Sequence, residues 1–175
     1  MKNQNTRMLT EAGLMIAIAQ ILSYLSIFEM PAGGSVTPGS MIPIMIFAIR
    51  WGAKKGLLTG AVYGMLQFIL GPKWSFHPVS IIFDYPVAFA FIGLAGLFRS
   101  SIKGITLGTI LGILGRFSCH VLSGVVVFAS SAPESQHPLV YSIIYNGTFL
   151  LPELAISLLI ILPLVHSTKI NQKIQ

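Results

Sequence analysis

The sequence predicts an all-α integral membrane protein: one domain of six membrane-spanning helices in a compact bundle. Of its 175 residues, 54% are hydrophobic and only 9% are charged, and the mean hydropathy is +0.79. Soluble domains usually carry about 25% charged residues. So few charges cannot cover a surface in water, so we expect lipid to be the main solvent of the outer face.

The apolar runs define the expected helices. We expect spans at about residues 8–28, 41–49, 56–70, 79–98, 104–129 and 140–166. The second run is too short to cross about 30 Å of hydrocarbon at 1.5 Å per residue. The preceding loop, residues 29–40, is therefore expected to dip into the bundle and cap an external pocket. Irregular backbone at that depth is tolerated only where it is buried in protein or lines a cavity.

The basic residues predict the orientation. Nine of the 11 lie at one set of helix ends, whereas Lys73 alone lies at the other and Arg116 lies within a span. The nine are Lys2, Arg7, Arg50, Lys54, Lys55, Arg99, Lys103, Lys169 and Lys173. Because basic residues concentrate on the cytoplasmic side, we expect both termini in the cytoplasm. The loops 29–40, 71–78 and 130–139 are then external, and the protein is multi-pass in the cell membrane.

Several classes of function are disfavoured. The basic residues flank apolar runs and form no patch, which argues against nucleic acid. The single cysteine, Cys119, cannot form an intrachain disulfide. There is no metal-ligand spacing, no phosphate-binding glycine loop and no nucleophile elbow. We therefore expect no enzyme, no catalytic residue, and no metal or cofactor bound by this chain. Active transport would draw energy from an ion gradient or a partner.

Four ionisable residues lie inside the expected spans, where their cost indicates function by default. Asp84 either binds a cationic or amine-bearing ligand or pairs with Arg116 or Lys73. Arg116 and His120 are four residues apart and share a helix face. For Arg116 we expect a structural role as counter-ion to Glu153 or Asp84. His120 either contacts a ligand or is satisfied by a backbone carbonyl.

The last expected span opens with further polar and aromatic residues. The Asn146 amide can both donate and accept hydrogen bonds, which suits a heteroaromatic ring, although an interhelical hydrogen bond would also satisfy it. Tyr141 and Asn146 lie about 140° apart on an ideal helix. They are expected to reach one ligand only if Tyr141 is at or before the helix start. Tyr85 and Tyr141 are interpreted as a stacking cage rather than as part of an interfacial aromatic belt.

A pair of small residues marks the first span. Gly13 and Ala17 are four apart and would let another helix pack closely. Because they lie in the expected cytoplasmic half, they indicate a partner membrane protein rather than a ligand.

Taken together, these motifs resemble a known family over nearly the whole chain. They are Leu-Thr-Glu11, Gly33 through Pro43, Gly-Pro-Lys73, Asp84 through Phe98, His120 with Gly124, and Tyr141 through Gly147. The chain is similar to the substrate-binding membrane subunit (S component) of energy-coupling factor (ECF) vitamin transporters, of the thiamine-specific type.

The resemblance implies a six-helix subunit that captures thiamine from outside. It would dock, through Gly13 and Ala17, on a shared module of one transmembrane coupling protein and two ATPases, which would use the ATP. By motif match, Asp84 takes the carboxylate position facing the aminopyrimidine. The expected ligand-binding residues are Asp84, Tyr85, His120, Gly124, Tyr141, Asn146 and Tyr63.

The sequence departs from this family at three places. Some members have Glu where this chain has Asp84, which shortens the reach by one methylene. Some have tryptophans where Gly34 and either Phe128 or Ala129 stand here. The stacking wall is therefore expected to be thinner, which affects ligand affinity and orientation more than ligand class.

Three other functions remain as alternatives. The same fold could bind another vitamin or a pyrimidine precursor. A stand-alone carrier could be driven by protons through Asp84, His120 and Glu153. An intramembrane enzyme using His120 and a carboxylate is the least favoured, because no nucleophile–base set is recognisable.

Overall fold

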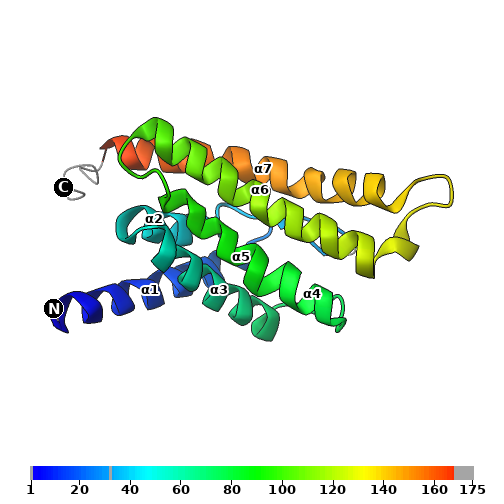
Figure 1. Ribbon diagram of the computed structural model, residues 1–175, viewed down its shortest axis with the longest axis horizontal. Helices are drawn as coiled ribbons and strands as arrows, with labels where there is room; N and C mark the ends of the chain where they lie inside the picture. The colour runs from blue at the N-terminus through cyan, green and yellow to red at the C-terminus, as the bar shows by residue number, and fades with distance from the viewer. Residues whose placement is uncertain (1, 32, 168–175) are drawn as a thin grey trace.

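The computed structural model shows a bundle of six helical segments (Figure 1). It describes residues 2–31 and 33–167. This bundle confirms the predicted all-α membrane fold. The six segments run as α1 (Lys2–Ser23), α2 (Ile42–Trp51), α3 (Ala53–Leu70), a composite fourth helix, α6 (Ile102–Val127) and α7 (Pro138–Ser167). The composite helix joins α4 (Pro78–Ile82), the π-helix η1 (Phe83–Val87), α5 (Ala88–Phe91) and the 3₁₀-helix η2 (Ile92–Gly96). A short 3₁₀-helix, η3 (Ala129–Ser131), follows α6.

Three of the described helices are long and apolar enough to cross a membrane: the composite fourth helix, α6 and α7. α2 is apolar but shorter, as its sequence predicted. α1 and α3 have more polar starts, since α1 opens Lys-Asn-Gln-Asn-Thr-Arg and α3 carries Lys54 and Lys55 in its first turn. α1 also lies earlier than the expected 8–28. It ends at Ser23 because the chain then turns into a hairpin, where the Ile27 amide bonds to the Val36 carbonyl.

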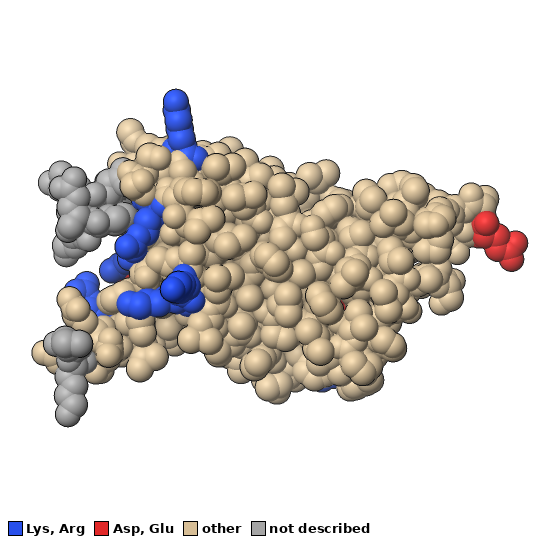
Figure 2. Space-filling view, in the orientation of Figure 1, with Lys and Arg blue, Asp and Glu red and all other residues tan. Residues whose placement is uncertain are grey.

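The outer surface is apolar, with charge confined to the ends. Exposed side chains along the bundle include Leu14, Leu58, Ile69, Leu151 and Leu159, as expected for a surface solvated by lipid. Figure 2 shows Lys and Arg atoms gathered at the end where α1 begins and α7 ends, with acidic atoms at the opposite tip. We call these the basic end and the acidic end.

Glycines bring α3 into backbone contact with the fourth helix. Gly56, Gly60 and Gly64 recur every four residues and form one stripe on α3. A Cβ at Gly60 would collide with the Phe89 carbonyl oxygen, and one at Gly64 with the Tyr85 carbonyl oxygen. Such close approach is how membrane helices gain van der Waals contact without a hydrophobic driving force. The stripe therefore fixes the part of the fourth helix that carries the candidate site.

The fourth helix is irregular where it carries Asp84 and Tyr85. Pro86 lies inside the π-helix η1, and a proline within a helix removes one backbone hydrogen bond and crowds the preceding turn. π-helical turns are rare and frequently occur at functional sites. The widened turn here presents Asp84 toward α6.

A hairpin occupies the loop between α1 and α2. Strands β1 (Phe28–Glu29) and β2 (Ser35–Val36) pair antiparallel, with Phe28 opposite Val36. The turn contains Gly33 and Gly34 with φ of 96° and 95°, a left-handed conformation that glycine adopts without strain. The chain then enters α2, which is almost wholly buried. The end of the loop, at Val36, Thr37, Gly39 and Ser40, is thus buried in the bundle, as the shortness of α2 predicted, whereas β1 is exposed.

We expect Gly60→Ala to destabilise the protein, because its methyl group would overlap the Phe89 carbonyl and overpacking costs about 1–3 kcal/mol. The matched control is Gly13→Ala, since a Cβ at Gly13 has nothing within 4 Å. Thermal unfolding of both variants in detergent tests this. The prediction is wrong if Gly60→Ala unfolds at the temperature of Gly13→Ala.

Candidate ligand-binding site

A cavity of about 310 Å³ lies toward the acidic end of the bundle, at the small end of the usual range for ligand pockets. Its lining comes from the hairpin loop, α3, the fourth helix, α6 and α7. All seven residues expected to bind ligand border it: Tyr63, Asp84, Tyr85, His120, Gly124, Tyr141 and Asn146. The structure therefore brings the sequence-derived set together, and contact of each with a ligand stays a prediction.

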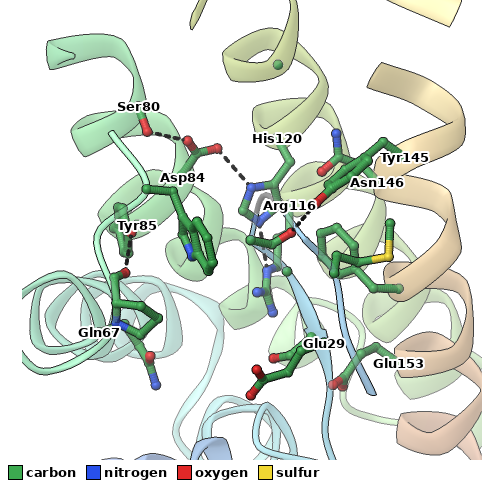
Figure 3. Close-up of a pocket in the computed structure, with 18 of the residues that line it drawn as sticks. Glu29, Gln67, Ser80, Asp84, Tyr85, Arg116, His120, Tyr145, Asn146 and Glu153 are labelled. Atoms are coloured by element: carbon green, nitrogen blue, oxygen red, sulfur yellow. Dashed lines mark hydrogen bonds and ion pairs between the residues drawn. The ribbon is translucent and has the colours of Figure 1, made fainter. Parts of the chain in front are cut away.

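A hydrogen-bonded chain of three side chains crosses the cavity (Figure 3). The Arg116 Nε lies 3.2 Å from His120 Nε2, and His120 Nδ1 lies 2.9 Å from Asp84 Oδ1. An arginine can only donate, so His120 Nε2 must accept. The hydrogen of a neutral imidazole then sits on Nδ1 and is donated to Asp84. Arg116 thereby sets the tautomer that His120 presents to the aspartate.

Two serines hold the other oxygen of Asp84. The Ser80 hydroxyl lies 2.6 Å from Asp84 Oδ2, and the Ser123 hydroxyl lies 2.5 Å from the same atom. Asp84 therefore accepts three hydrogen bonds from the fourth helix and α6. Sequence reasoning missed both serines. The spacing of Ser80, four residues before Asp84 on a helix, was the available signal.

Arg116 differs from its expected role as a direct counter-ion. Among the described residues, no ion pair joins it to Glu153 or Asp84. Its Nη1 lies 2.8 Å from the Met41 sulfur, and its guanidinium lies 4.2 Å from the centre of the Phe89 ring. The shared helix face directs Arg116 to His120 on its own helix, so its attraction to Glu153 and Asp84 acts through space rather than by a direct ion pair. Its link to Asp84 runs through the imidazole.

Lys73 is not the partner of Asp84 either. Its ammonium donates to the Ile69 carbonyl at 3.0 Å and lies near the Gly71 carbonyl at 3.4 Å. It therefore caps the end of α3, where a cation is favoured by the helix dipole.

The hairpin loop is attached to α7 at two levels. The Tyr145 hydroxyl donates to the Gly33 carbonyl at 3.0 Å. Deeper in the cavity, Glu153 Oε1 accepts from the Thr37 amide at 2.6 Å and from the Thr37 hydroxyl at 2.7 Å. The loop was expected to cap the pocket, but Thr37 and Tyr145 were not foreseen as its attachments. The pairing of a loop with a helix more than 100 residues later leaves no local pattern.

Gly124 faces the neighbouring helix α7 and not the open part of the cavity. A Cβ there would collide with the Ser142 hydroxyl and lie 3.7 Å from Asn146 Nδ2. Asn146 Nδ2 in turn donates to the Ser142 carbonyl at 2.8 Å. Gly124 therefore lets α7 approach α6 closely enough to place Asn146 beside the cavity.

Tyr141 and Asn146 reach the same cavity although both lie within α7, which begins at Pro138. Tyr141 lies just inside the helix rather than at or before its start, and contact of both residues with one ligand stays a prediction. Tyr141 is in the first turn, where its ring leans on that of Tyr145 at 5.8 Å between centroids. A long side chain in the first turn of a helix can reach beyond the helical face that ideal 100° steps assign to it.

The other two tyrosines have committed hydroxyls. Tyr63 is fully buried, donates to the Ala19 carbonyl at 3.2 Å and accepts from Gln67 at 2.7 Å. Tyr85 donates to the Pro72 carbonyl at 3.1 Å. Each of the two tyrosines can therefore offer a ligand only the surface of its ring, unless its hydroxyl gives up the hydrogen bonds just described.

An aromatic residue from α7 stands beside Gly34. A Cβ at Gly34 would lie 2.6 Å from the Phe149 ring, and that ring meets His120 edge-on at 5.9 Å between centroids. The wall left without a tryptophan at Gly34 is therefore supplied by Phe149. On the other side of the hairpin turn, Trp74 packs against Gly33 and also lines the cavity.

The small-residue pair lies away from the cavity. Gly13 and Ala17 are both exposed on α1, whose main contacts are with α2 and α3. This position leaves the strip open to another membrane protein.

Comparisons with known proteins agree with one another. Residues 9–173 match the family model "Thiamine transporter protein (Thia_YuaJ)". The chain is 38% identical over 168 residues to "Thiamine transporter ThiT" of Bacillus subtilis (strain 168), covering 87% of each chain. It is 30% identical over 153 residues to the protein of that name from Lacticaseibacillus paracasei, covering 78% of this chain and 76% of that one. Among solved structures, ThiT from Listeria monocytogenes matches with a TM-score of 0.83 at 26% identity, covering 96% of this chain and 98% of that one.

The hydrogen-bond chain predicts that His120 is neutral, with its hydrogen on Nδ1, in the ligand-free protein. Two-bond ¹H–¹⁵N correlation spectra of histidine-labelled protein distinguish the tautomers, and His120→Asn identifies the signal by its loss. His77 serves as an internal comparison, because it lies in an exposed loop and its Nδ1 accepts from the Val79 amide. Detection of a hydrogen on both His120 nitrogens would contradict the geometry.

Proposed function

The chain belongs to the thiamine transporter protein family, and from that premise we propose that it captures thiamine outside the cell as the substrate-binding subunit of an ECF transporter. It is a multi-pass membrane protein that takes up thiamine. Its relatives are named as transporters, not as enzymes. The finer assignments below are our proposal.

One observation carries the assignment of the ligand: Asp84 is held by three donors at the edge of the cavity. Thiamine offers an aminopyrimidine, a cationic thiazolium ring and a hydroxyl. A fixed carboxylate complements the amino group, and the Asn146 amide can pair with a ring nitrogen. The rings of Tyr85, Tyr141 and Phe149 provide faces and edges for flat or cationic groups.

The gathering of charge supports an orientation. The basic end would be cytoplasmic, as basic residues are in multi-pass proteins, so both termini would face the cytoplasm. The cavity, toward the opposite end, would then face the outside. The chain itself would bind no ATP. Delivery would depend on a coupling protein and two ATPases, docked against Gly13 and Ala17.

The first experiment is a calorimetric titration of the purified protein with thiamine in detergent, without ATP or partners. Saturable binding at a 1:1 ratio is expected. Parallel titrations with a pyrimidine precursor and with other vitamins test the ligand class. Absence of thiamine binding, together with saturable binding of another vitamin, would overturn the assignment.

Asp84→Asn is expected to weaken thiamine binding about tenfold or more, because a hydrogen bond to a charged group contributes roughly 1.5–3 kcal/mol. The control is Glu134→Gln, which removes a carboxylate from an exposed loop outside the cavity lining. Kd values from calorimetry compare the two. Equal Kd values for Asp84→Asn and the unaltered protein would remove Asp84 from the site.

Replacing both Gly13 and Ala17 by larger residues (Gly13→Leu with Ala17→Trp) should block ATP-dependent uptake while leaving thiamine binding unchanged. Bulk on this strip would keep a partner helix at a distance, whereas the cavity lies elsewhere. Uptake by cells or by vesicles containing the whole transporter measures the first quantity, and calorimetry the second. Leu159→Trp on the exposed face of α7 is the matched control. Normal uptake by the double variant would exclude docking at this strip.

A further inference from the structure

A second carboxylate lies in the floor of the cavity, and one of its oxygens is free. Glu153 follows Pro152 on α7, is 2% exposed and borders the cavity. Its Oε1 is occupied by the amide and hydroxyl of Thr37. Its Oε2 is buried and has no hydrogen-bond partner within the described part of the chain. Figure 3 shows the side chain directed from α7 into the cavity.

The nearest candidate cation, Arg116, attracts this carboxylate only through space and makes no direct contact with it among the described residues. Arg116 donates from Nε to His120, and its Nη1 faces the Met41 sulfur. The guanidinium also lies over the Phe89 ring, and no ion pair joins Arg116 to Glu153 in the described residues. Burying a charge without a partner is costly, so a buried carboxylate with a free oxygen is suited to a cation or a donor brought by a ligand.

The charges around the cavity favour a cationic ligand. Its lining contains three carboxylates (Glu29, Asp84 and Glu153) and one guanidinium, that of Arg116. Asp84 already accepts three hydrogen bonds, and Glu29 is exposed and accepts from the Ser26 hydroxyl at 2.6 Å. Among these three carboxylates, Glu153 is the one with a buried oxygen that has no hydrogen-bond partner.

The partly buried Asp84 and the buried Glu153 come from different parts of the cavity wall. Figure 3 shows Asp84 and Glu153 on opposite sides of His120 and Arg116. Thiamine also has two chemically distinct ends. A neutral aminopyrimidine is joined through one methylene to a thiazolium ring that carries the permanent positive charge. A pyrimidine beside Asp84 places the charged ring on the far side of the methylene.

We infer that Glu153 is a second recognition carboxylate, which binds the cationic ring of the ligand and selects it over neutral analogues. This inference rests on the proposed function and adds a specificity-determining residue to the site. Asp84 recognises the amino-bearing ring, whereas Glu153 recognises positive charge. The free oxygen Oε2 serves the ligand, and Oε1 keeps the carboxylate in place through Thr37.

The test compares two ligands on two proteins. The ligands are thiamine and a thiamine analogue in which a neutral thiophene replaces the thiazolium ring. Glu153→Gln keeps an oxygen to accept both Thr37 hydrogen bonds and removes only the charge. We expect this variant to bind thiamine about tenfold or more weakly and the neutral analogue within about threefold of the unaltered protein.

The control variant is Thr37→Val, which removes one hydrogen bond to Oε1 and leaves the charge of Glu153. It should weaken both ligands by the same factor, because it loosens the loop without altering the selection for charge. If Glu153→Gln cannot be purified, Glu153→Asp draws the charge back by one methylene, and the same selective loss of thiamine binding is expected.

Two outcomes would overturn the inference, and they are distinguishable. Equal loss of thiamine and neutral analogue in Glu153→Gln would reduce Glu153 to an anchor of the loop, with the proposed function intact. Failure of the unaltered protein to bind thiamine would overturn the proposed function and this inference with it.

Discussion

The cavity depends on a neutral histidine that links an aspartate to an arginine inside a bundle with an apolar surface. Neither Asp84 nor Arg116 can reach bulk solvent cheaply from this depth. His120 connects them without neutralising either, because it accepts from one and donates to the other. The price in desolvation is offset by Ser80 and Ser123, which complete the hydrogen bonds of Asp84. A site of fixed polarity is thereby kept ready for a ligand.

The backbone around the site is shaped to hold this chain of side chains. The glycine stripe of α3 lets the fourth helix approach to backbone contact, and the π-helix at Pro86 turns Asp84 toward α6. On the other side, Gly124 allows α7 to bring Asn146 to the cavity. Close packing at two interfaces thus places polar groups from three helices within reach of one small ligand.

The fold and the residues that border the cavity could be predicted from the sequence, partly from local signals and partly from the resemblance to a family. Apolar runs define helices, and a charge such as Asp84 inside a run is costly enough to indicate function. The partners of those charges could not be predicted. Arg116 turned to His120 rather than to a carboxylate, and Thr37 meets Glu153 across 116 positions. Side-chain rotamers and long-range pairings decide such contacts, and neither leaves a periodic pattern in the sequence.

The aromatic wall beside Gly34 shows a second limit of prediction from sequence. A glycine at that position predicts a thinner aromatic wall, yet the Phe149 ring fills the space from another helix. The space beside a glycine can thus be filled by a side chain from another helix. Local comparison of motifs therefore underestimates how much stacking surface remains.

The two tryptophans of the chain stand at opposite ends of the bundle. Trp74 packs on the hairpin turn and borders the cavity, whereas Trp51 ends α2 at the basic end, with the Lys55 ammonium 5.0 Å from its ring centre. Their indoles therefore report on separate environments. Light emitted by Trp74 follows the state of the cavity, and light emitted by Trp51 follows the surface at the basic end. The protein thus carries its own pair of optical probes, one for each end of the bundle.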